Sequence, residues 1–174
     1  MAAVDLLLRA AGVERSAIEG VVASRGPGSF TGVRVALATA QGLASALGVP
    51  AHGFSSLVAQ AARTEIPECL AAQPARRGFA YTQPFVRRDG RPEATEEPRI
   101  EALATLAEAQ LPVVAPAGLA LPPEAPLAPA PITTAEALLR LLAAEEKPDP
   151  STLVPIYLEP APAKPPARRL RGGS

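Results

Sequence analysis

An eight-residue turn rich in glycine is the part of the sequence whose residue types could do chemistry. It reads Arg-Gly-Pro-Gly-Ser-Phe-Thr-Gly over residues 25–32, between a short β-branched segment and a run of strong helix formers. Such a turn joins a strand to the electropositive start of a helix, where backbone N–H groups can contact an anion or a nucleotide. The candidate contacts are Gly26, Gly28, Ser29, Thr31 and Gly32.

The same turn also has a purely structural interpretation, and the residues leave both open. Its spacing matches neither the Walker pattern, which needs a lysine and then Ser or Thr after the second glycine, nor GxGxxG. Ser29 or Thr31 could instead serve as the N-cap of the following helix. An anion contact and a helix cap are therefore the two alternatives for this turn.

Other catalytic groups are scarce, because His52 is the only histidine and Cys69 the only cysteine. HExxH and Cys/His zinc patterns cannot be assembled from them, and a Ser-His-Asp site would have to use His52 as its base. A structural role is favoured for both residues, and no catalytic residue or metal ligand is predicted. A single cysteine also excludes an intrachain disulfide and fits a reducing compartment.

Composition excludes several classes of binding protein. Seventeen Lys and Arg residues balance 17 Asp and Glu residues, so no overall field attracts nucleic acid or an anionic membrane. Hydrophobic residues make up 48% of the 174 residues, which is enough to bury a core. No apolar run of about 18 residues is free of charges and helix breakers, so we expect no membrane span and a cytoplasmic location.

The first part of the chain is predicted to alternate helices and strands. This order indicates an α/β layer whose two strands pair in parallel across the second helix. That helix is apolar around most of its circumference, so it must be covered on more than one side. The expected elements are a helix over 2–11, a capped helical turn over 16–19, a strand over 21–24, a helix over 33–47, a strand over 51–54 and a helix over 57–62.

From about residue 69 the predicted secondary structure changes, and strands come before helices. The Asp89-Gly90 pair predicts a hairpin turn. We expect one lobe over 1–66, a second α/β lobe over 67–158 and a disordered tail over 159–174. The expected elements are strands over 69–73, 78–87 and 91–100, a helix over 101–110, a short strand in 112–116, a proline-rich connector over 121–131, a helix from Thr133 or Thr134 to about 146 and an extended piece over 153–158.

Several segments together make the sequence resemble a known family. They are residues 25–34, which contain the glycine turn, residues 38–44, Gly53-Phe54-Ser55-Ser56-Leu57, and residues 155–158 with 163–165. In these segments the chain closely resembles the TsaB (YeaZ) family of bacterial tRNA threonylcarbamoyladenosine biosynthesis proteins. The resemblance covers most of the chain and is weakest between residues 69 and 150.

The resemblance implies an actin-like ATPase (ASKHA, ribonuclease H-like) fold of two α/β lobes. It implies a non-catalytic scaffold that pairs with the catalytic subunit TsaD, while the ATPase TsaE joins them. The complex transfers a threonylcarbamoyl group from its adenylate to the adenosine beside the anticodon of certain tRNAs. The chain would reach tRNA only through this complex and would have no cofactor of its own, although ATP or ADP could bind at the shared interface.

The resemblance also suggests which surface meets the partner. The helices over 2–11 and 33–47 would contact TsaD, or a second copy of the chain when TsaD is absent. The candidate interface residues are Leu7, Leu8, Arg34, Leu37, Gln41 and Leu43.

The sequence departs from the family pattern at its start. TsaB-like chains begin with a strand carrying Asp-Thr-Ser and a β-meander, whereas this chain opens on the first helix. We therefore expect a first lobe truncated at its N-terminus. Either the start codon has been placed too late, which is favoured, or the truncation is real.

Two enzymatic alternatives come from other functional classes. An ASKHA-type phosphotransferase or ATPase would use the glycine turn on phosphate, but the opening Asp strand and an acid/base pair are lacking. A glycoprotease-like peptidase is disfavoured by the single histidine and single cysteine.

Overall fold

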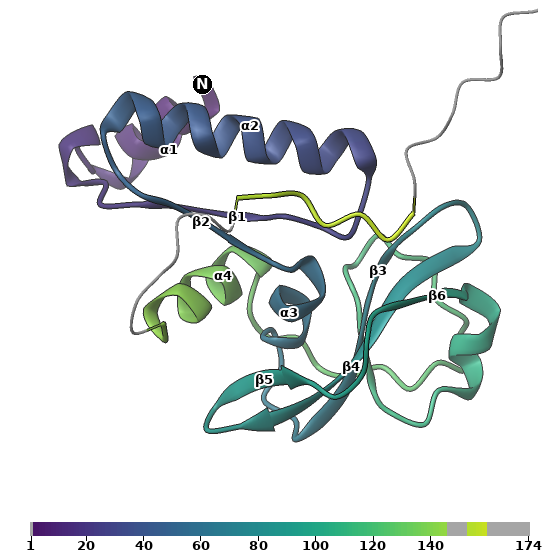
Figure 1. The fold of residues 1–174 in the computed structure, drawn as a ribbon. Helices are drawn as coiled ribbons and strands as arrows, with labels where there is room; N and C mark the ends of the chain where they lie inside the picture. Colours follow the sequence, from purple (N-terminus) through teal and green to yellow (C-terminus); the bar gives the residue numbers. More distant parts are fainter. Residues whose placement is uncertain (1, 146–152, 160–174) are drawn as a thin grey trace, which may run out of the picture.

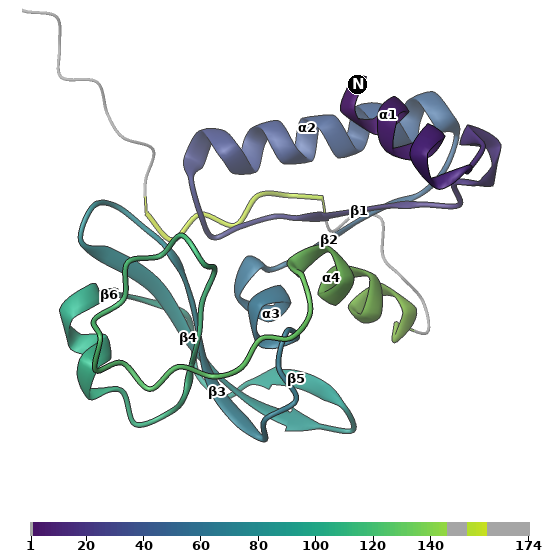
Figure 2. The ribbon, with the colours of Figure 1, turned by 180° about the vertical axis from the view of Figure 1, so that it is seen from behind.

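A computed structural model describes residues 2–145 and 153–159 of the chain. Strands β1 (Val21–Ser24) and β2 (Ala51–Phe54) form a two-stranded parallel sheet, as predicted, with register from Val21↔Ala51 to Ser24↔Phe54. Helix α2 (Phe30–Leu47) connects them and lies with α1 (Ala2–Ala11) on one face of this sheet. Helices α3 (Ser56–Ala61) and α4 (Thr134–Ala143) lie on the opposite face (Figures 1 and 2).

Local capping groups set the bounds of α2. Ser29 is the N-cap, and its hydroxyl accepts a hydrogen bond from the Gly32 N–H at 3.3 Å. The helix therefore begins at Phe30, three residues before the predicted start. It ends at Gly48, whose φ of 68° is readily adopted by glycine and whose N–H donates to the last carbonyls.

The second sheet has five strands, which are β3 (Glu68–Pro74), β4 (Phe79–Arg88), β5 (Arg91–Ala94), β6 (Arg99–Ala102) and β7 (Val113–Val114). Their order is β5-β4-β3-β7, and β6 pairs with another part of β4. Asp89 and Gly90 form the predicted hairpin turn, with φ values of 49° and 77°. One cluster of buried residues, including Leu57, Tyr81 and Phe85, joins α3 to this sheet.

Three predicted elements are corrected by the structure. The strand predicted over 91–100 is two strands, β5 and β6, which pair with different halves of β4. The helix predicted over 101–110 is wrong, because Ala102 still pairs with Phe79 and a 3-10 helix, η2 (Leu103–Glu108), follows. The predicted capping box over 16–19 is replaced by η1 (Arg15–Ala17), which has no side-chain cap.

The remaining predicted elements are present with small shifts. Ser55 caps α3 and Thr133 caps α4, through hydrogen bonds to the N–H groups of Leu57 and Glu136. The proline-rich connector makes a turn at residues 123–125 and then bridges to β7 at Val113↔Leu127. Among residues 2–145 and 153–159, no helix is both long enough and apolar enough to cross a membrane.

Residues 153–159 run beneath α2 beside β1 and reach the second sheet (Figure 1). The Ile156 N–H donates to the Arg25 carbonyl at 2.7 Å, and Leu153 packs against the core beneath α2. At the other end Glu159 pairs with Arg76. This segment thus ties the two sheets together. The lobe boundary at 66/67 stays a prediction. Of the predicted tail over 159–174, only Glu159 is among the described residues, and it is held by its ion pair.

Candidate functional site

The first half of the glycine turn is held by backbone hydrogen bonds. The Arg25 N–H donates to the Phe54 carbonyl at 2.9 Å, and the Gly26 carbonyl accepts from the Ser56 N–H at 2.7 Å. Gly26 and Pro27 are buried, and Gly26 has a φ of 94°, in the range that favours glycine. This half of the turn is therefore a structural joint between β1, α3 and residues 153–159.

The second half of the turn borders a cavity of about 400 Å³. Gly28, Ser29 and Phe30 form one wall, Ala75, Arg76 and Tyr81 form another, and residues 156–159 close the third. The structure thus brings Gly28 and Ser29 of the predicted anion contacts to one cavity. Gly26 is buried, Thr31 does not line the cavity, and the Gly32 N–H is taken by Ser29.

The polar groups of this cavity are already paired. Glu159 forms an ion pair with Arg76 and accepts a hydrogen bond from the Tyr81 hydroxyl at 3.2 Å. Burial, together with the neighbouring Glu159, raises the pKa of Tyr81 above its ordinary value. Tyr81 therefore stays a proton donor. Among the described residues, Glu159 is the only carboxylate lining the cavity, and its partners neutralise it.

An aromatic and cationic stack forms the outer rim of the cavity. The rings of Phe30 and Tyr157 lie 5.0 Å apart, and the Arg34 guanidinium lies 4.1 Å from the centre of the Phe30 ring. The Arg34 Nε–H also donates to the Tyr157 hydroxyl at 2.9 Å. This arrangement offers a ligand an apolar wall, and it holds residues 153–159 against the start of α2.

Neither His52 nor Cys69 lines this cavity. His52 lies buried on β2, and Cys69 lies buried on β3. Within the part of the chain that the structure describes, no group of three or more His, Cys, Asp and Glu side chains could hold a metal ion. Sequence reasoning missed Arg76, Tyr81 and Glu159 as cavity residues, since no local motif links β3 and β4 to the end of the chain.

The predicted interface residues lie in different environments. Leu7 is 68% exposed, while Leu8 and Leu43 both line a groove of about 130 Å³ between α1 and α2. Leu37 is only 4% exposed and packs against Ala23 of β1, so we correct its placement and leave it out of the surface. Leu37 is buried because its helical spacing places it on the same face of α2 as Val33, Ala40 and Ala44, which are also buried.

The other predicted interface residues of α2 are exposed but make contacts within the chain. Arg34 bonds Tyr157, and the Gln41 side-chain amide lies 3.5 Å from the Leu153 carbonyl. Two exposed apolar residues of the same layer were not predicted, Leu6 at 69% and Val35 at 59% exposure. The outer surface of α1 and α2 is therefore more apolar than the six predicted residues indicate.

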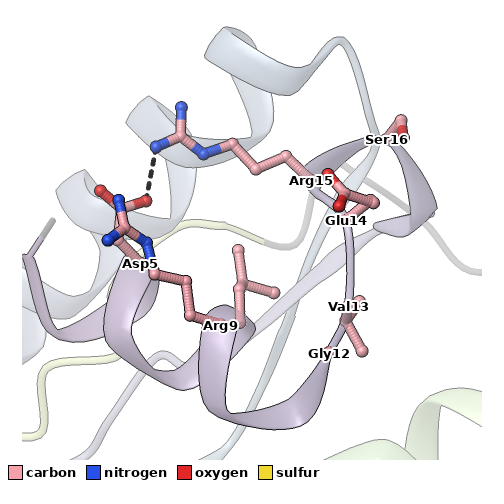
Figure 3. Close-up of a pocket in the computed structure, with 8 residues that line it drawn as sticks. Asp5, Arg9, Gly12, Val13, Glu14, Arg15 and Ser16 are labelled. Atoms are coloured by element: carbon pink, nitrogen blue, oxygen red, sulfur yellow. Dashed lines mark hydrogen bonds and ion pairs between the residues drawn. The ribbon is translucent and has the colours of Figure 1, made fainter.

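A third cavity, of about 690 Å³, lies between α1 and η1 (Figure 3). Arg15 reaches back over it to Asp5, with 2.6 Å between Nη2 and Oδ1, while Arg9 and Glu14 stand around the opening. The Arg15 side chain is 68% exposed, so this ion pair contributes at most about 1 kcal/mol. Its role is to fasten η1 to α1.

Comparison with known proteins places this fold and turn in a family. Residues 1–118 match the family model described as TsaD, tRNA N6-adenosine threonylcarbamoyltransferase. The chain therefore belongs to the TsaD family, and its homologues include TsaB, also called YeaZ, as the sequence resemblance predicted.

Three similar proteins illustrate the relationship. An uncharacterized protein of Mycobacterium leprae is 44% identical over 73 residues, which are 42% of this chain and 20% of that protein. The tRNA threonylcarbamoyladenosine biosynthesis protein TsaB of Escherichia coli is 36% identical over 85 residues, 47% of this chain and 37% of TsaB. YeaZ from Pseudomonas aeruginosa superposes with a TM-score of 0.64 at 25% identity, covering 89% of this chain and 81% of that one. The chain thus spans well under half the length of the first two relatives.

Proposed function

We propose that this chain is a TsaB-like, non-catalytic subunit of the complex that forms threonylcarbamoyladenosine next to the anticodon in tRNA. In this proposal it binds and supports the catalytic subunit TsaD. The similarity to Escherichia coli TsaB and to YeaZ supports a role in this modification. An actin-like, ASKHA-type arrangement of the two sheets is part of the same proposal.

The observation that carries the proposed partner role is the apolar outer surface of α1 and α2. Leu6, Leu7 and Val35 are each more than half exposed on these two helices, and Leu8 and Leu43 line the groove between the helices. Exposed apolar residues gathered on one layer are typical of a protein interface, because isolated monomers rarely keep such a surface in water. We call this set of five residues the α1–α2 surface.

The α1–α2 surface suits a helical partner. Its groove runs between two helices, so an amphipathic helix of TsaD could insert apolar side chains between Leu8 and Leu43. A second copy of the chain would compete for the same surface when TsaD is absent. TsaE would join the assembled pair, and tRNA would contact the complex rather than this chain by itself.

Charge substitutions on this surface should weaken TsaD binding. We expect Leu7→Glu and Val35→Glu each to lower the amount of TsaD that co-purifies with the chain by about tenfold, because each would bury an unpaired carboxylate. Both positions are exposed, so the free chain should keep its fold. The measurement is quantitative pull-down of TsaD by the tagged full chain.

Two matched controls lie elsewhere on the molecule. Leu127→Glu has nearly the same exposure as Leu7, 67% against 68%, and Leu139→Glu on α4 has the same 59% as Val35. Both controls should retain TsaD. Loss of TsaD from all four variants, or from none, would show that the α1–α2 surface is not the interface. Tight ATP binding by the isolated chain that Gly28→Val abolishes would instead favour the phosphotransferase or ATPase alternative.

A further inference from the structure

Three arginines from three different elements surround a small cavity on the side of the molecule away from α2. Arg87 lies on β4, Arg91 begins β5, and Arg140 lies on α4. Together with Glu65 and residues of the β4–β5 turn they line about 110 Å³. We propose that this arginine cavity is a binding site for a phosphate group, an inference independent of the proposed function.

The charge of the arginine cavity is incompletely balanced. In the part of the chain that the structure describes, Glu65 is the only carboxylate that lines it. Its oxygens lie 3.7 Å from Arg87 Nη1 and 3.5 Å from Arg140 Nη1. Arg140 also pairs with Glu136, at 2.9 Å between Nη2 and Oε1, so the three arginines and these two carboxylates leave a formal charge of +1. In the described part of the chain, no hydrogen bond or ion pair engages the Arg91 side chain. An anion would therefore find one guanidinium without a partner.

Arg87 is held in place at the inner wall. Its Nη1 donates to the Gly90 carbonyl at 2.5 Å and its Nη2 donates to the Thr64 carbonyl, so the guanidinium plane is fixed. The side chain is 15% exposed, and its Nε is buried with no hydrogen-bond partner. Because this Nε is closed off from solvent, Arg87 would act on an anion through the positive charge of its fixed guanidinium.

The size and geometry of the cavity favour a single phosphate group. A volume of about 110 Å³ accommodates a tetrahedral oxyanion but not a whole nucleotide. Guanidinium groups bind phosphate oxygens through paired N–H donors, and Arg91 and Arg140 stand exposed at the rim where they could close on it. Glu65 is 68% exposed, so its carboxylate can turn away into water when the anion enters.

The test is titration calorimetry of the full chain with inorganic phosphate and, separately, with methyl phosphate, at constant ionic strength maintained with chloride. We expect saturable binding of at least one of them. Arg91→Gln and Arg140→Gln should each raise the dissociation constant by about tenfold, because each removes one charge-assisted contact. Binding of inorganic phosphate only identifies the free ion as the ligand, and binding of methyl phosphate extends the site to phosphate monoesters.

Arg88→Gln is the matched control, since Arg88 neighbours the same turn, pairs with Glu93 at 3.7 Å and does not line the cavity. Its dissociation constant should equal that of the unaltered chain. The arginine cavity is rejected as a site if neither ligand binds, or if Arg88→Gln weakens binding as much as Arg91→Gln does. Circular dichroism of each variant without ligand verifies that folding is unchanged, as expected for exposed side chains.

Discussion

Gly26→Ala is expected to lower the free energy of unfolding by about 3 kcal/mol, because a backbone clash and an unfavourable φ add together. Gly26 has a φ of 94°, which residues with a Cβ rarely adopt. A Cβ at this position would lie 2.7 Å from the Ile156 carbonyl oxygen, closer than nonbonded atoms allow. Relief of this clash would move residues 153–159 away from the turn.

Gly42→Ala is the control for this prediction. Gly42 lies exposed within α2, and a Cβ there would meet no atom within 4 Å. Because alanine favours helix more than glycine does, this variant should be more stable by about 1 kcal/mol. Urea unfolding followed by circular dichroism measures both changes. If Gly26→Ala were as stable as the unaltered chain, the tight packing of the turn against Ile156 would be wrong.

Raising the pH from 8 to 10.5 should lower the free energy of unfolding by about 2 kcal/mol through Cys69. Cys69 is 4% exposed on β3, and burial raises the pKa of its thiol to about 11, although Arg87 opposes the shift. In the unfolded chain this thiol ionises near 9.0, its ordinary value. Between these two values the unfolded state binds fewer protons, so stability is intact below pH 9 and falls as the pH rises toward 11.

Cys69→Ala isolates the part of this pH dependence that belongs to the thiol. Tyrosine ionisation, including that of Tyr81, contributes to both proteins and cancels in the comparison. The variant is expected to start less stable, because it leaves a small cavity, but to lose about 2 kcal/mol less between pH 8 and 10.5. Equal losses in the two proteins would mean that the folded and unfolded thiols ionise alike.

Local signals predicted much of the fold. Ser29 and Gly48 mark the two ends of α2 by capping chemistry, and Asp89 with Gly90 marks a hairpin by its turn type. The segment over 91–110 was mispredicted because its conformation depends on distant pairing. Ala102 extends a strand only because Phe79 lies beside it, and no residue near 102 encodes that contact.

The candidate sites show the same division between local and distant information. The glycine turn is visible in the sequence, but its cavity also needs Arg76, Tyr81 and Glu159 from the second sheet and the end of the chain. The apolar circumference of α2 does not distinguish its inner from its outer face, and the packing of Leu37 with Ala23 of β1 shows that Leu37 faces inward. The arginine cavity likewise combines the β4–β5 hairpin with α4, which lies far away in sequence.

Threonylcarbamoyladenosine formation by purified TsaD, with and without this chain, tests the central claim most directly. The reaction contains tRNA and threonylcarbamoyl adenylate, and the modified nucleoside is measured by mass spectrometry after digestion of the tRNA. We expect about tenfold more product when the chain is present, as for a typical coupling between two partners, and none from the chain without TsaD. Product formed by the chain without TsaD, or no increase on adding the chain to TsaD, would contradict the account.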